Sequence, residues 1–207
     1  MERRTVSERA EDSGDLDLAE AGLREDALAD AALADSARQG DRAAFGQLYD
    51  RYARMVHGLL LARVPYGAVD DLAQDVFLQA LGRLRSLRDA ASFGAWIAAI
   101  ARNRSHDYHR RSRGEVELRD ELCAEGAAGG RAAGAPSAAH PAPDSEAAMA
   151  LAAIRSLPET YRETLVLRLV EGMTGPEIAA RTGLTPGSVR VNLHRGMQML
   201  RQKLGGL

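Results

Sequence analysis

The chain of 207 residues has a single cysteine, Cys123, so it can form neither an internal disulfide nor a cysteine-based zinc site. Aromatic residues make up only 4% of it, which argues against an all-β protein, because strands are rich in aromatic and β-branched side chains. No apolar stretch reaches the roughly 18 residues that a membrane-spanning helix needs. The charged start of the chain also lacks the apolar segment of a signal peptide. We therefore expect a soluble protein of the reducing cytoplasm.

The apolar residues that are present, 45% of the chain, are mostly Ala and Leu and favour helices. The predicted fold class is all-α. The formal net charge of −2 conceals alternating blocks, with −6 over residues 1–40, +4 over 41–112, −4 over 113–150 and +4 over 151–207. The two basic blocks indicate two modules that bind a polyanion. The alternative is that the blocks reflect ordinary variation of surface charge.

The stretch between the basic blocks is a predicted linker. Residues 124–150 contain 12 Ala, 4 Gly and 3 Pro, and such a composition buries too little apolar area to offset the entropy of ordering. The start of the chain is acidic and aperiodic, with a short amphipathic helix around Leu23, Ala27 and Leu28 as an alternative. The predicted organisation is an acidic disordered tail (1–29), a helical domain (30–113), a flexible linker (114–146) and a second helical domain (147–207).

The first domain contains a helix with an unusual polar face. An apolar stripe from Phe45 to Leu60 predicts one helix that ends near Pro65, and a second stripe predicts a helix over residues 69–84, with Leu81 in its core. Opposite that second stripe lie Asp71, Gln74, Asp75 and Leu78. An exposed Leu78 among polar groups is typical of a protein-docking face, and an isolated surface leucine is the alternative.

The next helix changes character along its length. It begins with the apolar segment from Phe93 to Ala101 and continues with Arg102, Arg104, His106, His109, Arg110 and Arg111. The second half could meet phosphates or unstacked bases, and a solvated basic helix end is the alternative. His106 and His109 have no carboxylate or cysteine partner at metal-ligand spacing, so we predict no metal site.

The second domain contains a predicted helix-turn-helix. Thr174, Pro176 and Glu177 have the order of a capped helix start, Gly183 marks a turn, and Thr185 caps the final helix. That helix is predicted to bury Val189, Leu193, Met197, Leu200 and Leu204. Its outward side then carries Gly187, Ser188, Val191, His194 and Arg195, with Arg190 and Asn192 on the flanks. Small residues and donors there favour a helix that enters a major groove, against a helical hairpin that only packs.

These segments resemble the sigma-70 family of bacterial sigma factors, in its small extracytoplasmic-function group. The run DDLAQDVFL (70–78) is similar to the family's region 2.2, and the stretch over residues 93–108 is similar to regions 2.3 and 2.4. Residues 157–163 and 177–184 resemble region 4. The resemblance covers both predicted domains and implies a region 2 bundle joined to a region 4 helix-turn-helix.

The resemblance implies a role for each set of residues. Docking on the polymerase β′ clamp falls to Asp71, Gln74, Asp75 and Leu78. Melting and binding of the −10 element falls to Arg88, Phe93, Trp96, Arg102, Asn103, Arg104, Asp107, Tyr108, Arg110 and Arg111. Reading of the −35 element falls to Thr185, Gly187, Ser188, Arg190, Val191, Asn192, His194 and Arg195.

The implied function is a dissociable initiation subunit that directs core RNA polymerase to promoters. Its implied partners are the β′ clamp and β flap of core polymerase, promoter DNA and an anti-sigma factor. The two promoter elements lie about 70 Å apart, a span that the linker can reach. We predict no catalytic residue, metal or cofactor, and hence no enzyme. A stand-alone helix-turn-helix repressor is the main alternative, and an enzyme with a DNA-binding tail is a second one.

Overall fold

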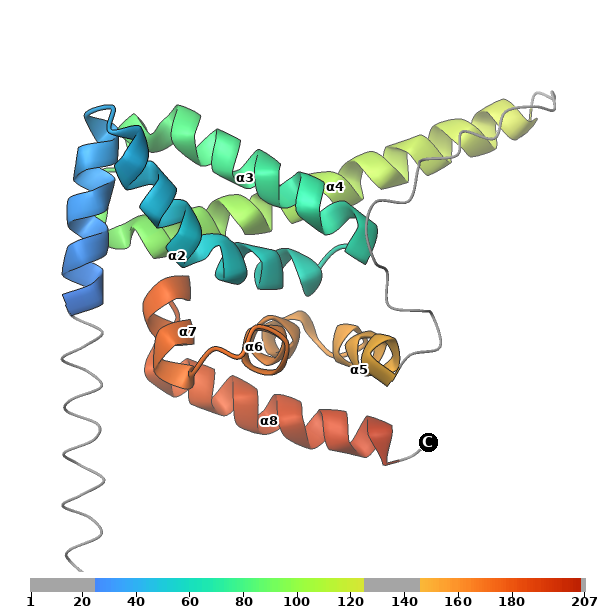
Figure 1. The fold of residues 1–207 in the computed structure, drawn as a ribbon. Helices are drawn as coiled ribbons and strands as arrows, with labels where there is room; N and C mark the ends of the chain where they lie inside the picture. Colours follow the sequence, from blue (N-terminus) through green and yellow to red (C-terminus); the bar gives the residue numbers. More distant parts are fainter. Residues whose placement is uncertain (1–24, 125–145, 206–207) are drawn as a thin grey trace, which may run out of the picture.

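The computed structural model describes residues 25–124 and 146–205, and this part of the chain is helical without strands. Figure 1 shows an upper group of helices, from a helix over residues 25–38 through α4, above a lower group from α5 to α8. The elements in order are α2 (Arg42–Leu61), η1 (Tyr66–Ala68), α3 (Val69–Arg83), η2 (Leu84–Ser86), η3 (Ala90–Ser92), α4 (Phe93–Ala124), α5 (Glu146–Arg155), α6 (Glu159–Leu169), α7 (Gly175–Thr182) and α8 (Pro186–Leu204). The all-α prediction is confirmed. None of the described helices combines the length and apolar character needed to cross a membrane.

The helix over residues 25–38, α2, α3 and α4 form the first bundle. Asp41 starts α2 by accepting hydrogen bonds from the backbone N–H groups of Ala43 (2.9 Å) and Ala44 (3.2 Å). Asp30 of the preceding helix is buried, and its carboxylate accepts from the Tyr52 hydroxyl at 2.6 Å and from Arg51 at 2.6 Å. The first bundle therefore begins before residue 30, inside the segment predicted as a tail.

α4 is longer than the sequence pattern predicts. The helix continues to Ala124, whereas the predicted domain ended at residue 113 and the predicted linker began at 114. Five of the eight residues over 115–122 are Glu or Leu, which have high helix propensity. The predicted tail over residues 1–24 and the linker over 125–145 lie outside the described residues.

Helices α5 to α8 form the second bundle, whose first helix begins at Glu146. α6 and α8 pack against each other, and Gly196 permits their close approach. A Cβ atom on Gly196 would lie 3.0 Å from the Leu165 side chain and 3.2 Å from Tyr161 Cβ. Leu204, predicted in the core, is 41% exposed because it ends α8.

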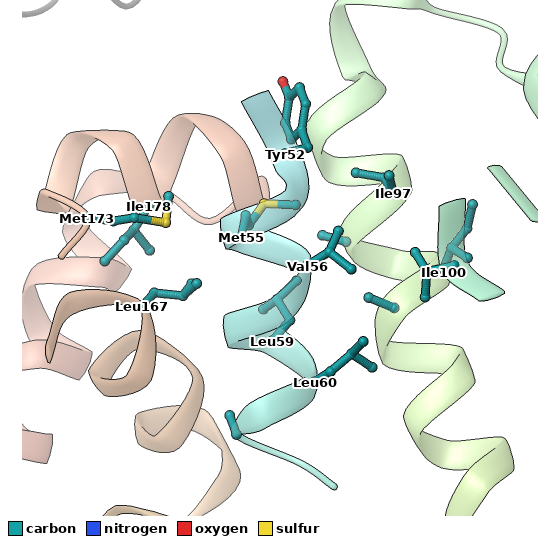
Figure 2. Close-up of a cluster of buried hydrophobic side chains, with 14 of the residues drawn as sticks. Tyr52, Met55, Val56, Leu59, Leu60, Ile97, Ile100, Leu167, Met173 and Ile178 are labelled. Carbon is teal, nitrogen blue, oxygen red and sulfur yellow. The ribbon is translucent and has the colours of Figure 1, made fainter. Parts of the chain in front are cut away.

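The two bundles pack against each other through α2 and α4. Figure 2 shows α2 in the middle, with Ile97 and Ile100 on one side and Leu167, Met173 and Ile178 on the other. Met55 and Leu59 of α2 have no exposed surface, and neither have Leu167 and Ile178. The predicted pair of tethered modules therefore shares a continuous apolar core in this conformation.

Candidate nucleic-acid and docking interfaces

The predicted docking face lies on the outer side of α3. Leu78 is 60% exposed, as the helical periodicity predicts, and Asp71 and Gln74 are exposed beside it. Asp75 is half-buried, and its carboxylate lies 3.9 Å from the Arg104 guanidinium of α4. The structure therefore brings all four predicted residues to one helix face.

A groove of about 740 Å³ runs along this face between α2 and α3. Gln74 and Leu78 line one wall, and Tyr49 of α2 lines the other, with its ring centroid 4.5 Å from that of Phe77. Leu81, predicted in the core, is 47% exposed because it opens into this groove. The groove gives the docking face an apolar floor that the sequence pattern did not reveal.

One end of the groove is closed by a contact between the two bundles. His57 Nδ1 of α2 lies 2.8 Å from Glu171 Oε1, and both residues line the groove. The hydrogen bond to Glu171 raises the pKa of His57 above its ordinary value, against the opposing effect of burial.

The predicted −10 surface follows α4. Trp96, Asn103, Asp107 and Arg110 recur at steps of seven, four and three residues, so they share one side of the helix. Asn103 and Arg110 are exposed, and Arg110 pairs with Asp107 at 3.0 Å. This side therefore offers an amide, a carboxylate and a guanidinium beside an indole ring.

Other predicted −10 residues lie elsewhere. Phe93 is fully buried against Tyr52, at a ring-centroid distance of 5.1 Å, and thus belongs to the core. Tyr108 is half-buried, and Arg88 is exposed before η3. Arg111 is exposed one helical turn after Asp107 and so adjoins the side that carries Asn103. Arg102 lies on the side of α4 that faces α6, where it bonds to Glu163.

The helix-turn-helix forms as predicted, with a capping box. The Thr174 N–H donates to Glu177 Oε2 at 2.7 Å, and the Glu177 N–H donates to Thr174 Oγ1 at 3.3 Å. The bond from the Thr174 N–H, together with a second bond that the Thr174 hydroxyl donates to Glu177 Oε2 at 2.8 Å, lowers the pKa of Glu177. Gly183 makes the turn at a φ of 76°, and Thr185 caps α8 by accepting from the Ser188 N–H at 3.1 Å.

The first turns of α8 present a continuous outward face. Val191 is 43% exposed, and the other exposed members of the predicted −35 set are Thr185, Gly187, Ser188, Arg190, His194 and Arg195. Asn192, predicted on a flank, is only 9% exposed, because the side of α8 that carries it packs inward. The face combines hydroxyl, imidazole and guanidinium groups with an apolar side chain.

A second groove lies between α6 and α8 and was not predicted. It measures about 550 Å³, and its lining includes Leu169, Leu193 and Met197. Leu193 and Met197 were predicted in the core, yet both remain half-buried at the groove. A signal for this groove in the sequence is Leu169, an apolar residue at the end of α6 that lies exposed at the groove.

The sequence reasoning also missed a buried carboxylate between the bundles. Glu163 of α6 accepts hydrogen bonds from Arg63 at 3.0 Å and from Arg102 at 3.2 Å. Burial alone would raise the pKa of Glu163, but these two guanidinium groups outweigh it and hold the pKa below its ordinary value. Within residues 25–124 and 146–205, no cluster of His, Cys, Asp and Glu could hold a metal ion.

The comparisons with known families match both bundles. Residues 48–115 match the family model described as Sigma-70 region 2, and residues 147–200 match the model described as Sigma-70, region 4. Together the matches include every residue of the three predicted surfaces.

Two curated relatives align with this chain over most of their own length and most of its length. RNA polymerase sigma factor CarQ of Myxococcus xanthus is 33% identical over 174 residues, which cover 82% of this chain and 94% of that protein. The ECF RNA polymerase sigma-E factor of Escherichia coli K12 is 31% identical, with 81% and 90% covered.

Two solved structures have a similar fold. CnrH in complex with the cytosolic domain of CnrY has a TM-score of 0.56 at 27% identity and covers 86% of this chain and 98% of its own. RpoE of Bartonella quintana, in complex with the anti-sigma factor NepR, has a TM-score of 0.53 at 21% identity, with 78% and 96% covered.

Proposed function

The chain belongs to the sigma-70 family of RNA polymerase sigma factors, in its extracytoplasmic-function group, and directs RNA polymerase to promoters; we propose how its surfaces divide that task. The α3 face with Asp71, Gln74, Asp75 and Leu78 docks on the β′ clamp of core polymerase. Its central leucine and the adjoining groove supply the apolar area, and the surrounding polar groups supply specificity.

The helix-turn-helix binds the −35 element with α8 in the major groove. A Cβ atom on Gly187 would meet nothing within 4 Å, so the start of α8 is open and duplex DNA can approach it closely. Arg190 and Arg195 supply donors to phosphates or base edges, and Val191 can contact a thymine methyl group.

The exposed side of α4 binds the separated −10 strand. Asn103 and Asp107 stand where a flipped base can form hydrogen bonds, and Trp96 offers a ring for stacking. Arg110 and Arg111 are exposed next to them and can bind phosphates. Unpairing is thus favoured by stacking and charge, with no catalytic residue, because bond formation belongs to the polymerase.

The groove between α6 and α8 suits the β flap. Leu169, Leu193 and Met197 form its apolar part, and Arg168 and Arg201 border it. The groove adjoins the DNA-reading face at His194 and extends from there toward Arg201, away from the Gly187 end of α8, so one bundle can hold polymerase and duplex DNA together.

We also infer an anti-sigma partner and a cytoplasmic site of action. One similar structure holds CnrH with the cytosolic domain of CnrY, and the other holds the sigma factor RpoE with the anti-sigma factor NepR. The docking face on α3 and the outward face of α8 are both exposed, so a competing protein can bind to either of them.

The joint presence of a polymerase-docking face and a DNA-reading helix supports this proposal most strongly. The test is to mix the purified chain with core RNA polymerase, follow co-elution by size exclusion, and map start sites on genomic templates. We expect co-elution and a set of starts that core polymerase alone does not produce. A chain that stays separate from polymerase while binding duplex DNA would instead be a stand-alone repressor.

A further inference from the structure

A basic hollow lies at one end of the first bundle, where the helix over residues 25–38 meets η2. It measures about 330 Å³, near the lower end of the range for small-ligand pockets, and is lined by Asp35, Arg38, Gln39 and Arg85. In Figure 1 this helix lies at the end of the bundle where α3 ends and α4 begins. Three of the four lining residues precede residue 48 and so lie outside the part of the chain that matches the region 2 family model.

Arg38 is held at the hollow before any ligand binds. Its Nη1 donates to Asp35 Oδ1 at 3.0 Å, and its side chain is only 34% exposed. A guanidinium group has five N–H donors, so the bond to Asp35 leaves others for a ligand. Binding of a phosphate to this ordered side chain costs less conformational entropy than binding to a free arginine.

Arg85 supplies a second cation to the hollow. It is exposed on η2, and Arg83 before it and Arg88 after it are exposed too. Within residues 25–124 and 146–205, none of these three arginines takes part in an ion pair. Consecutive Cα atoms are about 3.8 Å apart, so the Cα atoms of Arg83 and Arg88 lie within about 8 and 11 Å of that of Arg85. The hollow therefore continues into a basic surface, which attracts a polyanion.

This basic surface adjoins the predicted −10 surface. Arg88 belongs to the residues that the family resemblance assigns to the −10 element, and the chain passes from it through η3 into α4. Trp96 lies in the first turn of α4, at the same end of the bundle. A separated strand that follows α4 past Trp96 toward the start of the helix can therefore reach Arg88 and then the hollow.

The other lining groups distinguish a nucleotide from a simple anion. Gln39 is exposed, and its side-chain amide has no hydrogen-bond partner in the described part of the chain, so it can both donate and accept. The Asp35 carboxylate repels a bare phosphate but can accept a hydrogen bond from the exocyclic amino group of a base. A nucleotide brings a phosphate for the two guanidinium groups together with a base edge for Gln39 and Asp35.

We propose that this hollow binds one nucleotide of the separated promoter strand, beside the −10 element. The phosphate contacts Arg38 and Arg85, and the base edge contacts Gln39 and Asp35. The proposal rests on the function proposed above, which places the separated strand on α4, and it adds a site on a helix outside the matched region 2. Promoters of this chain should favour a base with an exocyclic amino group at that position over thymine, which has none.

Crosslinking tests where the strand lies. A photoreactive probe is attached to Gln39→Cys in a Cys123→Ser background, and the chain is mixed with core polymerase and a promoter fragment whose −10 segment is mismatched. We expect crosslinks to one nucleotide beside the −10 element. The same probe on Lys203→Cys, in the last turn of α8, is the control and should not mark that nucleotide. Crosslinks to a polymerase subunit instead of DNA, or no crosslinks, would overturn the proposal.

Charge variants test the phosphate contact. Arg38→Gln and Arg85→Gln should each weaken binding of the chain–polymerase complex to the mismatched fragment about fivefold and lower the salt slope by about 1. Lys203→Gln removes the same charge from the second bundle and should leave the slope unchanged. Circular dichroism verifies that each variant folds. The same salt slope in all of these proteins would overturn phosphate binding at the hollow.

An abasic nucleotide at the crosslinked position tests contact with the base. It should weaken binding of the unchanged chain about fivefold, and that of Gln39→Ala much less, because this variant already lacks the amide. A merely structural role of Gln39 would give the same loss in both proteins, and that result would overturn the nucleotide site.

Failure of the site can be distinguished from failure of the proposed function. If core polymerase never binds the chain, the proposed function fails. Crosslinking of the free chain to a single-stranded oligonucleotide, with the probe on Gln39→Cys, then decides whether the hollow binds DNA. Normal initiation without a crosslink at the hollow would reject the site alone.

Discussion

Arg102 Nε on α4 lies 3.2 Å from Glu163 Oε2 on α6, so a cation of the first bundle is held by a carboxylate of the second. The same carboxylate accepts from Arg63 at 3.0 Å. The pairing joins a residue that the family resemblance assigns to DNA with one that no sequence pattern singled out. The contribution of this pairing to the stability of the chain can be measured separately from its effect on DNA binding.

Removing the Glu163 charge should destabilise the chain. Glu163→Gln removes the carboxylate that Arg102 binds and leaves Arg63 with Glu159 alone, so we expect the free energy of unfolding to fall by about 1 to 3 kcal/mol. Urea denaturation followed by circular dichroism measures this change. Asp35→Asn, which removes an exposed pair with Arg38, should cost less than about 0.5 kcal/mol. Equal losses of unfolding free energy in the two variants would show that the buried ion cluster stabilises the chain no more than the exposed pair does.

Leu78→Asp should abolish binding to core polymerase while the fold is kept. Leu78 is exposed, so a carboxylate there meets water in the free chain but would be buried in the docked complex. Co-elution with core polymerase measures binding, and circular dichroism verifies folding. Leu28→Asp is the control, because Leu28 is an exposed leucine on the helix over residues 25–38. A Leu78→Asp chain that still assembles with polymerase would exclude this face from docking.

Arg195→Ala should weaken binding to a −35 duplex by about 1 to 3 kcal/mol. Arg195 is exposed on the outward face of α8, where a guanidinium can reach a base edge or a phosphate. Fluorescence anisotropy at several salt concentrations measures the affinity and its salt dependence. Lys203→Ala removes a cation from the last turn of the same helix and should change affinity little. Unchanged affinity in Arg195→Ala would remove this residue from the DNA surface.

The packing of the two bundles should weaken as pH rises above about 6.5, because it raises the pKa of His57. Glu171 raises the pKa of His57 while the bundles are packed, aided by Asp70, while Arg54 lies 4.0 Å from Glu171 and offsets part of its charge. When the bundles separate, the pKa of His57 returns toward about 6.5. The stabilisation is therefore fully present below about pH 6.5 and is lost as pH rises through the raised pKa.

Energy transfer between dyes on Gly82→Cys of the first bundle and Gln202→Cys of the second, in a Cys123→Ser background and between about pH 6 and pH 8, tests this dependence on His57. We expect transfer to fall toward the higher pH in the unchanged chain. His57→Gln keeps an amide beside Glu171 but does not titrate, so its transfer should vary less with pH. The same pH profile in both proteins would assign the effect to other groups.

Local features of the molecule could be predicted from sequence because neighbouring residues determine them. The capping box of Thr174 and Glu177 depends on a spacing of three residues, and the exposure of Leu78 follows from helical periodicity. The extension of α4 to Ala124 was not predicted, because the boundary at residue 113 follows the change in charge and composition, whereas the helix propensity of the next residues continues the helix.

Contacts between the bundles could not be predicted in the same way. Gly58 and Leu167 are brought together by the fold, and nothing near either residue in the sequence marks the partner. Asn192 and Phe93 show the same limit, since a family motif gives a position but not its burial in this arrangement. Their roles at DNA stay predictions.

We propose that this chain holds paired and separated promoter strands on behalf of RNA polymerase. Permanganate reactivity of thymines at a mapped start site tests it most directly, because permanganate attacks unpaired thymines. We predict reactive thymines in the −10 region only when the chain and core polymerase are both present. Polymerase that binds the promoter with this chain but leaves every thymine protected would contradict the account.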